Sequence, residues 1–448
     1  MKKNLFFIGI SLLFIGGSIL SSCTKEGPPG IAGTNGTNGT NGTNGTNGVD
    51  GSTKCTECHN PATVELAATQ FEFSKHSYGE AAFEESGNVS CTPCHASEAF
   101  LYVCKNNVPS TFTATNGVYT NDYATVATAS IGEITCVTCH SSLHTTYGKA
   151  DLSPLTTVKP VSMTMWAGAK EINLTADGGR GNLCVKCHQP RPFTRSNTTD
   201  KNVLDYAGLA SNPTAVFYDA AQANALNVLK PGYRTHTHYG TVGAIFAGKG
   251  GVEFTGAASY TSSTHTLVAS CQDCHMTTQN NRAGGHTFTA AGNFAGCNQT
   301  GCHPDPVTSG SVSLWVAPRT EVKKELDDLA AKLKVAGIEI MNRNPDATTN
   351  MWAANTTNHY DGYLNIYDPI NNPNGLTNNP GGTFKNPSTS GFSAAQIVIN
   401  NGLPLITLTN AQMGALINFQ LCLREYSLGI HNYKYTTALL KNSLAILP

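Results

Sequence analysis

The chain has 448 residues, and its formal net charge of -1 reflects 28 Lys and Arg residues against 29 Asp and Glu residues. Only 13% of the residues are charged, so we expect no basic face for a phosphate backbone and exclude nucleic acid as a partner. The length beyond the N-terminal segment is enough for one large domain or two modest ones.

The chain opens on a pattern typical of a secretory signal. Two lysines precede an apolar run over residues 5–20, and the segment ends in Leu-Ser-Ser-Cys23, which resembles a bacterial lipobox. Residues 1–22 are therefore predicted to be a lipoprotein signal peptide, and Cys23 the lipidation site. A plain signal peptide, or an uncleaved membrane helix with an incidental cysteine, is the alternative. We expect an exported lipoprotein of the outer membrane or cell surface, and a periplasm-facing position stays open.

Residues 23–53 are predicted to form a tether. Every third residue from Gly27 to Gly51 is glycine, which is collagen-like periodicity. Proline is scarce in the other positions, so a solvated tether competes with a trimeric stalk that would make the protein a homo-oligomer. Both readings lift the folded part away from the lipid.

Six cysteine–histidine motifs follow and carry the chemistry. Five have the pattern Cys-x-x-Cys-His, in which two thiols form thioethers with a haem and the histidine ligates its iron. A sixth, from Cys297 to His303, places four residues between its cysteines. The predicted attachment cysteines are Cys55, Cys58, Cys91, Cys94, Cys136, Cys139, Cys184, Cys187, Cys271, Cys274, Cys297 and Cys302. The predicted proximal ligands are His59, His95, His140, His188, His275 and His303.

The cofactors predicted from these motifs are six c-type haems with their iron. Structural zinc is the competing interpretation, but zinc does not require a histidine directly after the second cysteine. A disulfide framework fits poorly, because short Cys-x-x-Cys pairs beside histidine are redox motifs more often than staples. Cys104 and Cys422 are left over, either paired with each other or buried and inert.

Eight further histidines are candidates for the opposite face of each iron. They are enough for two imidazoles at all six irons, which gives low-spin iron that works at low potential. The candidates are His76, His144, His236, His238, His265, His286, His359 and His431.

The predicted fold class is mostly irregular and α-helical, with little β-structure. Residues 54–310 form the six-haem region, whose segments have little hydrophobic periodicity, so we expect haems to fill its core. Residues 311–448 form a C-terminal helical region that packs on the haems. A helix is predicted after Pro318 to about Gly337, burying Val322, Leu326, Leu329 and Leu333. Residues 342–407 are expected to be irregular, before two helices over 411–428 and 433–447 that break at Gly429.

The chain resembles bacterial multihaem cytochromes, the group that contains pentahaem nitrite reductases, hydroxylamine oxidoreductases, octahaem tetrathionate reductases and extracellular electron-transfer cytochromes. The resemblance rests on Ser74-Lys-His76, Ser263-Thr-His265, Gly285-His286-Thr-Phe288 and Gly429-Ile-His431-Asn432. It implies that His265 faces the haem of His303, His286 that of His140, His431 that of His275, and His76 that of His188. The haems of His59 and His95 would then draw on His144, His236, His238 or His359.

The resemblance supports a scaffold more than an enzyme. Nitrite reductases of this group bind their catalytic haem through lysine, whereas all six motifs here end in histidine. We therefore expect an electron carrier with no catalytic residue, serving redox partner proteins or extracellular acceptors. One alternative is a reductase of a small nitrogen or sulfur oxyanion, with an open iron at His59 or His95 and acid–base roles for His236 and His238. The other is a subunit of an extracellular cytochrome filament.

Overall fold

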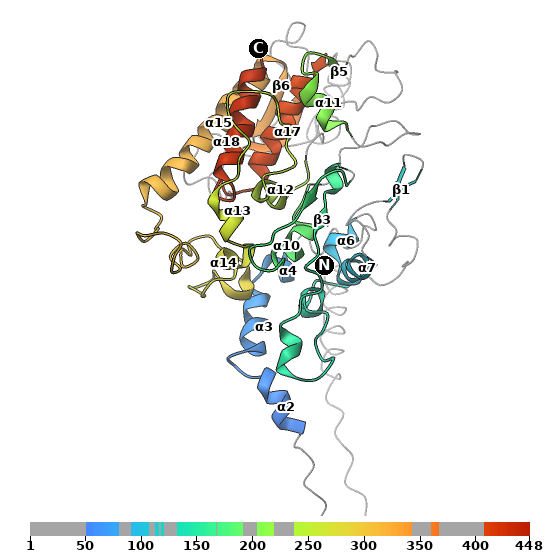
Figure 1. Cartoon of the computed structure of the whole chain (residues 1–448), viewed down its shortest axis with the longest axis vertical. Coiled ribbons are helices and arrows are strands. Elements are labelled where there is room, and N and C mark those ends of the chain that lie inside the picture. The colour runs from blue at the N-terminus through green and yellow to red at the C-terminus, as the bar shows by residue number, and fades with distance from the viewer. Residues whose placement is uncertain are drawn as a thin grey trace, which may run out of the picture. The chain divides into compact units, whose positions relative to one another are not determined.

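A computed structural model of the chain describes residues 51–79, 91–106, 113–115, 118–120, 132–166, 168–190, 204–218, 237–342, 360–366 and 407–448. The predicted signal peptide, Cys23 and nearly all of the tether lie outside these residues, as do His236 and His359. The described part is mostly helical and irregular, with its few strands in two-stranded pairs, so the expected fold class is confirmed at this level (Figure 1). Among the described residues, no helix is both long and apolar enough to cross a bilayer.

The first part of the fold is built from short helices joined by turns. Its α-helices are α2 (Gly51–Cys58), α3 (Val64–Glu72), α4 (Lys75–Tyr78), α6 (Thr92–His95), α7 (Ser97–Lys105), α9 (Cys136–Cys139) and α10 (Gly181–Cys187). The 3₁₀ turns η1 (Lys149–Leu152) and η2 (Thr164–Trp166) lie among them. Short helices bury little apolar surface of their own, which agrees with the weak periodicity of this region.

The central part continues in the same manner. It contains α11 (Tyr206–Ser211), α12 (Val242–Phe246), α13 (Thr264–Val268), α14 (Cys271–His275) and the 3₁₀ turn η4 (Gly285–Thr287). His265, His275 and His286 therefore lie on short helical turns whose positions depend on their neighbours.

Long helices occupy the C-terminal part, as expected. After a π-helical turn, η5 (Val312–Val316), helix α15 (Ala317–Val335) buries the predicted face, with Val322 and Leu329 fully inaccessible. It ends before Gly337, whose φ of 86° lies in the left-handed region.

The last two helices are α17 (Asn410–Arg424) and α18 (Tyr433–Ile446). The predicted break at Gly429 is confirmed by its φ of 87°. Helix α17 ends four residues earlier than expected, because Tyr426 and Leu428 also take positive φ angles and the Glu425 side chain caps this turn. The loop between α17 and α18 thus has its own architecture.

Residues 342–407 are not irregular throughout. Strand β6 (Ile338–Asn342) pairs antiparallel with β7 (Tyr360–Ile366), which lies inside that range. Ile338 and Ile340 are buried in the core against α15, and this tertiary packing stabilises a strand in a segment rich in turn-forming residues. The other pairs are β1 (Thr113–Thr115) with β2 (Val118–Thr120), β3 (Val161–Ser162) with β4 (Glu171–Ile172), and β5 (Val216–Tyr218) with β8 (Leu408–Thr409).

The largest hydrophobic cluster is centred on α15, α17 and α18. A polar bridge ties it to the central part, because the Asn418 side chain on α17 hydrogen-bonds both main-chain groups of Val252. Asn418 also donates to Ser443 on α18. The long helices therefore support the central part of the chain, which carries several of the predicted ligands.

Candidate functional site

A single large cavity receives the predicted haem ligands. Its volume is about 3120 Å³, and it is lined by every cysteine and histidine of the six motifs. Six other candidate ligands also line it, namely His76, His144, His238, His265, His286 and His431. Of the candidate ligands, only His236 and His359 cannot be placed, because they lie outside the described residues.

The Cys-x-x-Cys-His motifs each form one helical turn. In four of them the backbone N–H of the histidine donates to the carbonyl of the first cysteine, as His140 does to Cys136 at 2.9 Å. The same bond joins His59 to Cys55, His95 to Cys91 and His188 to Cys184. Residues i, i+3 and i+4 share a helix face, so one turn presents both thiols and the imidazole in one direction.

Polar residues inside two motifs start these turns. The carboxylate of Asp273 accepts from the Ser270 N–H at 2.8 Å, and the Thr138 hydroxyl accepts from the Thr135 N–H at 2.9 Å. Both are the reciprocal contact of a capping box, which satisfies a backbone donor that the helix itself leaves free. In these two motifs, the residue directly before the second cysteine therefore helps to set the geometry of the turn.

The sixth motif is built differently. Its longer insertion forms turns in which the Cys302 N–H donates to the Gln299 carbonyl at 3.0 Å. The Asn298 side chain fixes this loop through hydrogen bonds to both main-chain groups of Val307. The Cys297–His303 segment is thus held by contacts with a residue outside the motif, whereas the other motifs form a single helical turn.

Each motif histidine lies opposite a second histidine across part of the cavity. The distances between ring centroids are 5.9 Å for His59–His144, 6.0 Å for His76–His188, 6.3 Å for His95–His238, 6.4 Å for His140–His286, 5.9 Å for His265–His303 and 6.2 Å for His275–His431. The four pairs implied by the family resemblance are among them. The structure places His144 beside His59 and His238 beside His95, a choice that sequence reasoning left open.

Protein surroundings favour the neutral form of several of these imidazoles. His188 lines the cavity, and desolvation there, with the nearby His76 and His275, lowers its pKa to about 3. Burial likewise lowers the pKa values of His76, His275 and His286. A neutral imidazole keeps the lone pair that a metal ligand needs.

Phe288 joins three of the histidine pairs. Its carbonyl lies 2.8 Å from His275 Nδ1, and its ring centroid lies 4.9 Å from that of His76 and 5.8 Å from that of His286. Its φ of 54° is unusual for an aromatic residue and aims both groups at the cavity. The Gly285-His286-Thr-Phe288 segment is therefore a packing centre as well as a ligand source.

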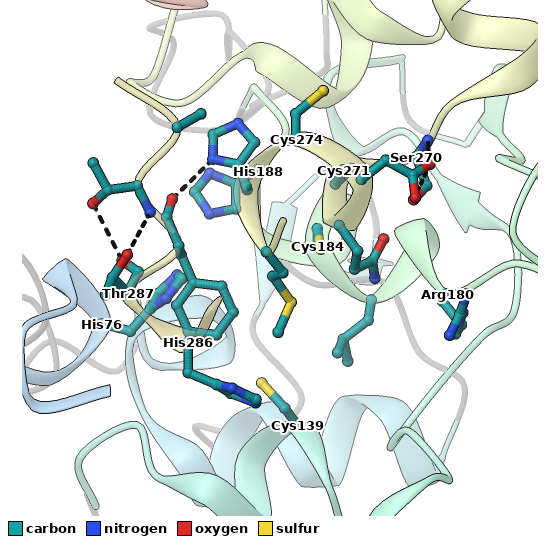
Figure 2. Close-up of a pocket in the computed structure, with 18 of the residues that line it drawn as sticks. His76, Cys139, Arg180, Cys184, His188, Ser270, Cys271, Cys274, His286 and Thr287 are labelled. Carbon is teal, nitrogen blue, oxygen red and sulfur yellow. Dashed lines mark hydrogen bonds between the residues drawn. The ribbon is translucent and has the colours of Figure 1, made fainter. Parts of the chain in front are cut away.

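Cysteines of different motifs also meet. The thiols of Cys184 and Cys271 are in hydrogen-bonding contact, as are those of Cys187 and Cys94. Cys139, Cys184, Cys271 and His188 are among the labelled residues that line the cavity in Figure 2. The His188 motif thus directly contacts two other motifs.

A buried carboxylate holds His431. Glu425 Oε2 lies 2.6 Å from His431 Nδ1, and the Glu425 side chain is fully inaccessible. Burial alone would raise the pKa of Glu425, but hydrogen bonds from His431, Gly429 and Ser427 hold that pKa below its ordinary value. The contact leaves His431 Nε2 as the ring atom facing His275.

The loop that carries His431 also anchors the His265 segment. Asn432 Oδ1 accepts from the Ser263 N–H at 2.9 Å, and the Ile430 carbonyl lies 3.4 Å from His265 Nδ1. Two motifs of the family resemblance, distant in sequence, therefore pack together.

Helix α17 fixes the segment that supplies His238. Gln420 accepts from the Thr237 N–H at 3.0 Å, and the Leu421 carbonyl accepts from the Thr241 hydroxyl at 2.8 Å. The fully buried Arg424 donates to the Thr237 carbonyl and lies 4.1 Å from the ring centroid of Tyr239. These contacts explain why a loop histidine occupies a defined position opposite His95.

Cys104 and Cys422 are both buried and both free. Cys104 packs in a small cluster with Phe100 and Leu183, whereas Cys422 lies in the main core on α17. Of the two interpretations left open by the sequence, the structure shows the buried, unpaired one.

Sequence reasoning missed Glu425 as a contributor to the site. No spacing rule links it to His431, because the loop from Glu425 to His431 is closed by side-chain contacts rather than by helical periodicity. The only signal was an acidic residue six positions before a predicted ligand, at the end of a predicted helix.

Comparison with known proteins adds no assignment. No family model matches the chain, and no curated protein or solved structure matches it.

Proposed function

We propose that this chain is a multihaem c-type cytochrome that carries electrons along six covalently bound haems. The observation that supports it best is the pairing of all six motif histidines with a second histidine, at centroid distances from 5.9 to 6.4 Å. Metal–nitrogen bonds of about 2.0 Å on both sides put the two ligating nitrogens about 4 Å apart, and each ring centre lies farther from the metal than its nitrogen. The observed spacing therefore leaves room for one iron between each pair.

The space and the donor set also fit haem. Shared among six sites, the cavity offers about 520 Å³ each, within the range of roughly 300–1,000 Å³ typical of ligand pockets. A structural zinc ion needs about four protein ligands. Among the described residues, no group of three or more His, Cys, Asp or Glu side chains converges on a metal-sized site. Two histidines at each site suit an iron porphyrin, because the porphyrin itself supplies the other four nitrogen ligands.

The pairing favours a carrier over a reductase. A reductase needs one iron with a free position for substrate, and the candidates for that iron were those of His59 and His95. His144 and His238 now stand opposite these two histidines. A site with histidine on both sides transfers electrons without binding a substrate.

When bound, each haem iron would supply a one-electron Fe(III)/Fe(II) couple. The chain's own residues set the order of the sites. From the Cys184–Cys271 and Cys187–Cys94 contacts we infer that the His188 site lies next to the His275 and His95 sites. His286 and His76 both pack on Phe288, which connects the His140 site to the same centre. The His188 site is thus the junction of the proposed path.

The ends of the path follow from the remaining contacts. Gln299 of the sixth motif donates to the Asp273 carbonyl at 3.1 Å, so we infer that the His303 site lies beyond the His275 site. His144 follows His140 by four residues and pairs with His59, so the His59 site lies beyond the His140 site. We propose that redox partner proteins or extracellular acceptors exchange electrons at these two ends, and that lipid on Cys23 keeps the protein at a bacterial membrane or cell surface.

The test is the visible spectrum of the reduced holoprotein before and after carbon monoxide, together with its intact mass. We expect a mass increase of six haems and a low-spin spectrum that carbon monoxide leaves unchanged. A bare chain by mass contradicts the cytochrome proposal. A carbon monoxide adduct at one haem contradicts the carrier and favours the reductase.

A further inference from the structure

The His431 imidazole has an unusual partner. Oε2 of Glu425 accepts from His431 Nδ1 at 2.6 Å and from the Ser427 hydroxyl at 2.5 Å. Oε1 accepts from the backbone N–H groups of Gly429 at 2.8 Å and Ser427 at 3.1 Å. Four donors therefore surround a carboxylate that water does not reach.

Other predicted ligands have weaker acceptors. His275 and His265 meet main-chain carbonyls at 2.8 and 3.4 Å. His140 Nδ1 has no hydrogen-bond partner among the described residues. A charged acceptor forms a stronger hydrogen bond than a neutral carbonyl and makes the imidazole a more basic ligand.

The position of the negative charge matters as well. Inside a protein the effective dielectric constant is far below that of water, so a buried charge acts strongly on a neighbouring metal. A more basic ligand and a nearby anion both favour Fe(III), which carries one positive charge more than Fe(II). Both effects lower the reduction potential.

We propose that Glu425 is a positioning residue that lowers the reduction potential of the haem held between His275 and His431. This inference rests on the proposed function, since it requires that haem to be present. In the proposed path this site lies between the His303 site and the junction at the His188 site. Glu425 thereby creates a low-potential step that separates one end of the path from its centre.

The test is the Glu425→Gln variant of the full chain, matured with haem and titrated by spectroelectrochemistry. Glutamine keeps an oxygen for the Ser427 and Gly429 N–H groups, so the loop keeps its anchors, but the charge and the acceptor for His431 are lost. We expect one of the six components to move to a more positive potential. The change should be about tenfold in the oxidised-to-reduced ratio at fixed potential, or about 59 mV for a one-electron couple.

Two further variants make the result specific. Glu325→Gln removes another buried carboxyl, one that contacts Lys441 rather than a predicted ligand, and should leave all six components in place. Ser427→Ala removes a hydroxyl that donates to Oε2 and accepts from the His431 backbone N–H at 3.1 Å. Without that donor Oε2 is left to His431 Nδ1, so the same component should move slightly to a more negative potential. Potential shifts of opposite sign in the Glu425→Gln and Ser427→Ala variants are not expected from a loss of structure.

A Glu425→Gln titration that superimposes on the wild type overturns the inference. A haem that becomes high-spin in this variant without a potential shift also overturns it, because Glu425 would then only hold the ring in place. If Glu425→Gln does not fold, the Ser427→Ala titration decides, and an unshifted or positive component there counts against the proposal. Failure of the proposed function would look different, since the wild-type protein would then lack haem by mass.

Discussion

The six-motif region and the C-terminal helical region differ in what occupies their interiors. Helices α15, α17 and α18 form the centre of the main apolar cluster, which residues such as Ile245 and Phe254 join from the central part, and Leu329 is fully inaccessible. The segments from Cys55 to His303 instead surround a cavity of about 3120 Å³. The C-terminal helices therefore enclose packed side chains, whereas the six motifs enclose a cavity.

The two regions therefore depend on different sources of stability. A cluster of close-packed side chains offsets the entropy of ordering long helices. The short turns around the cavity bury only smaller apolar clusters, such as the one that contains Val161, Met163 and Phe246, so we expect a bound group to contribute to their stability. The long helices then act as the fixed frame, because α17 and the loop after it hold His238 and His431.

The largest expected effect comes from withholding haem. In a host unable to attach haem, the segments from 51 to 190 and from 237 to 303 should lose their fold, while α15, α17 and α18 keep helical structure. Limited proteolysis with mass spectrometry would locate the cuts, and circular dichroism would follow the helices. Equal protease resistance of both regions without haem would break the comparison.

A core substitution should have the next largest effect, on stability alone. Leu329 is fully buried on α15, so Leu329→Ala leaves a cavity and should lower the free energy of unfolding by about 2–5 kcal/mol. Denaturant unfolding followed by circular dichroism measures this loss. The visible spectrum of the folded variant should match that of the wild type, and a shifted spectrum would show that the core and the haem region are not separable.

A ligand substitution should change one site out of six. Replacing His238 with Ala removes the histidine opposite His95, so one haem should become high-spin and bind one equivalent of carbon monoxide. Electron paramagnetic resonance and carbon monoxide titration count the affected haem. His236→Ala is the matched control, two residues away, and should keep all six haems low-spin; the reverse outcome would assign His236 as the ligand instead.

The smallest expected effect is a pH dependence in the helical core. Burial raises the pKa of Glu325 to about 7, despite the nearby Lys441. The folded state therefore prefers the neutral carboxyl, and its contribution to stability is complete below about pH 4.5 and disappears as the pH rises through 7. Glu325→Gln avoids this loss, so its advantage over the wild type in the free energy of unfolding should grow by about 1 kcal/mol from pH 5 to pH 8, and Tm measured against pH follows it. An advantage that stays constant with pH would contradict the raised pKa.

Much of the fold and of the site could be predicted from local patterns. Helix α15 follows from the spacing of Val322, Leu326, Leu329 and Leu333, since a 3.6-residue period is written directly in the sequence. The motif histidines follow from adjacency to their cysteines, since one helical turn suffices to align them. The break at Gly429 follows from the freedom of glycine at positive φ.

Tertiary structure alone decided which distant side chains meet. His144 rather than another histidine lies opposite His59, and His238 lies opposite His95, because turns and α17 contacts bring them there. Strand β7 and the carboxylate of Glu425 were likewise invisible, since their partners lie across the fold or across a non-helical loop. Local periodicity determines on which face of its own helix or strand a residue lies, whereas long-range pairing depends on how the whole chain packs.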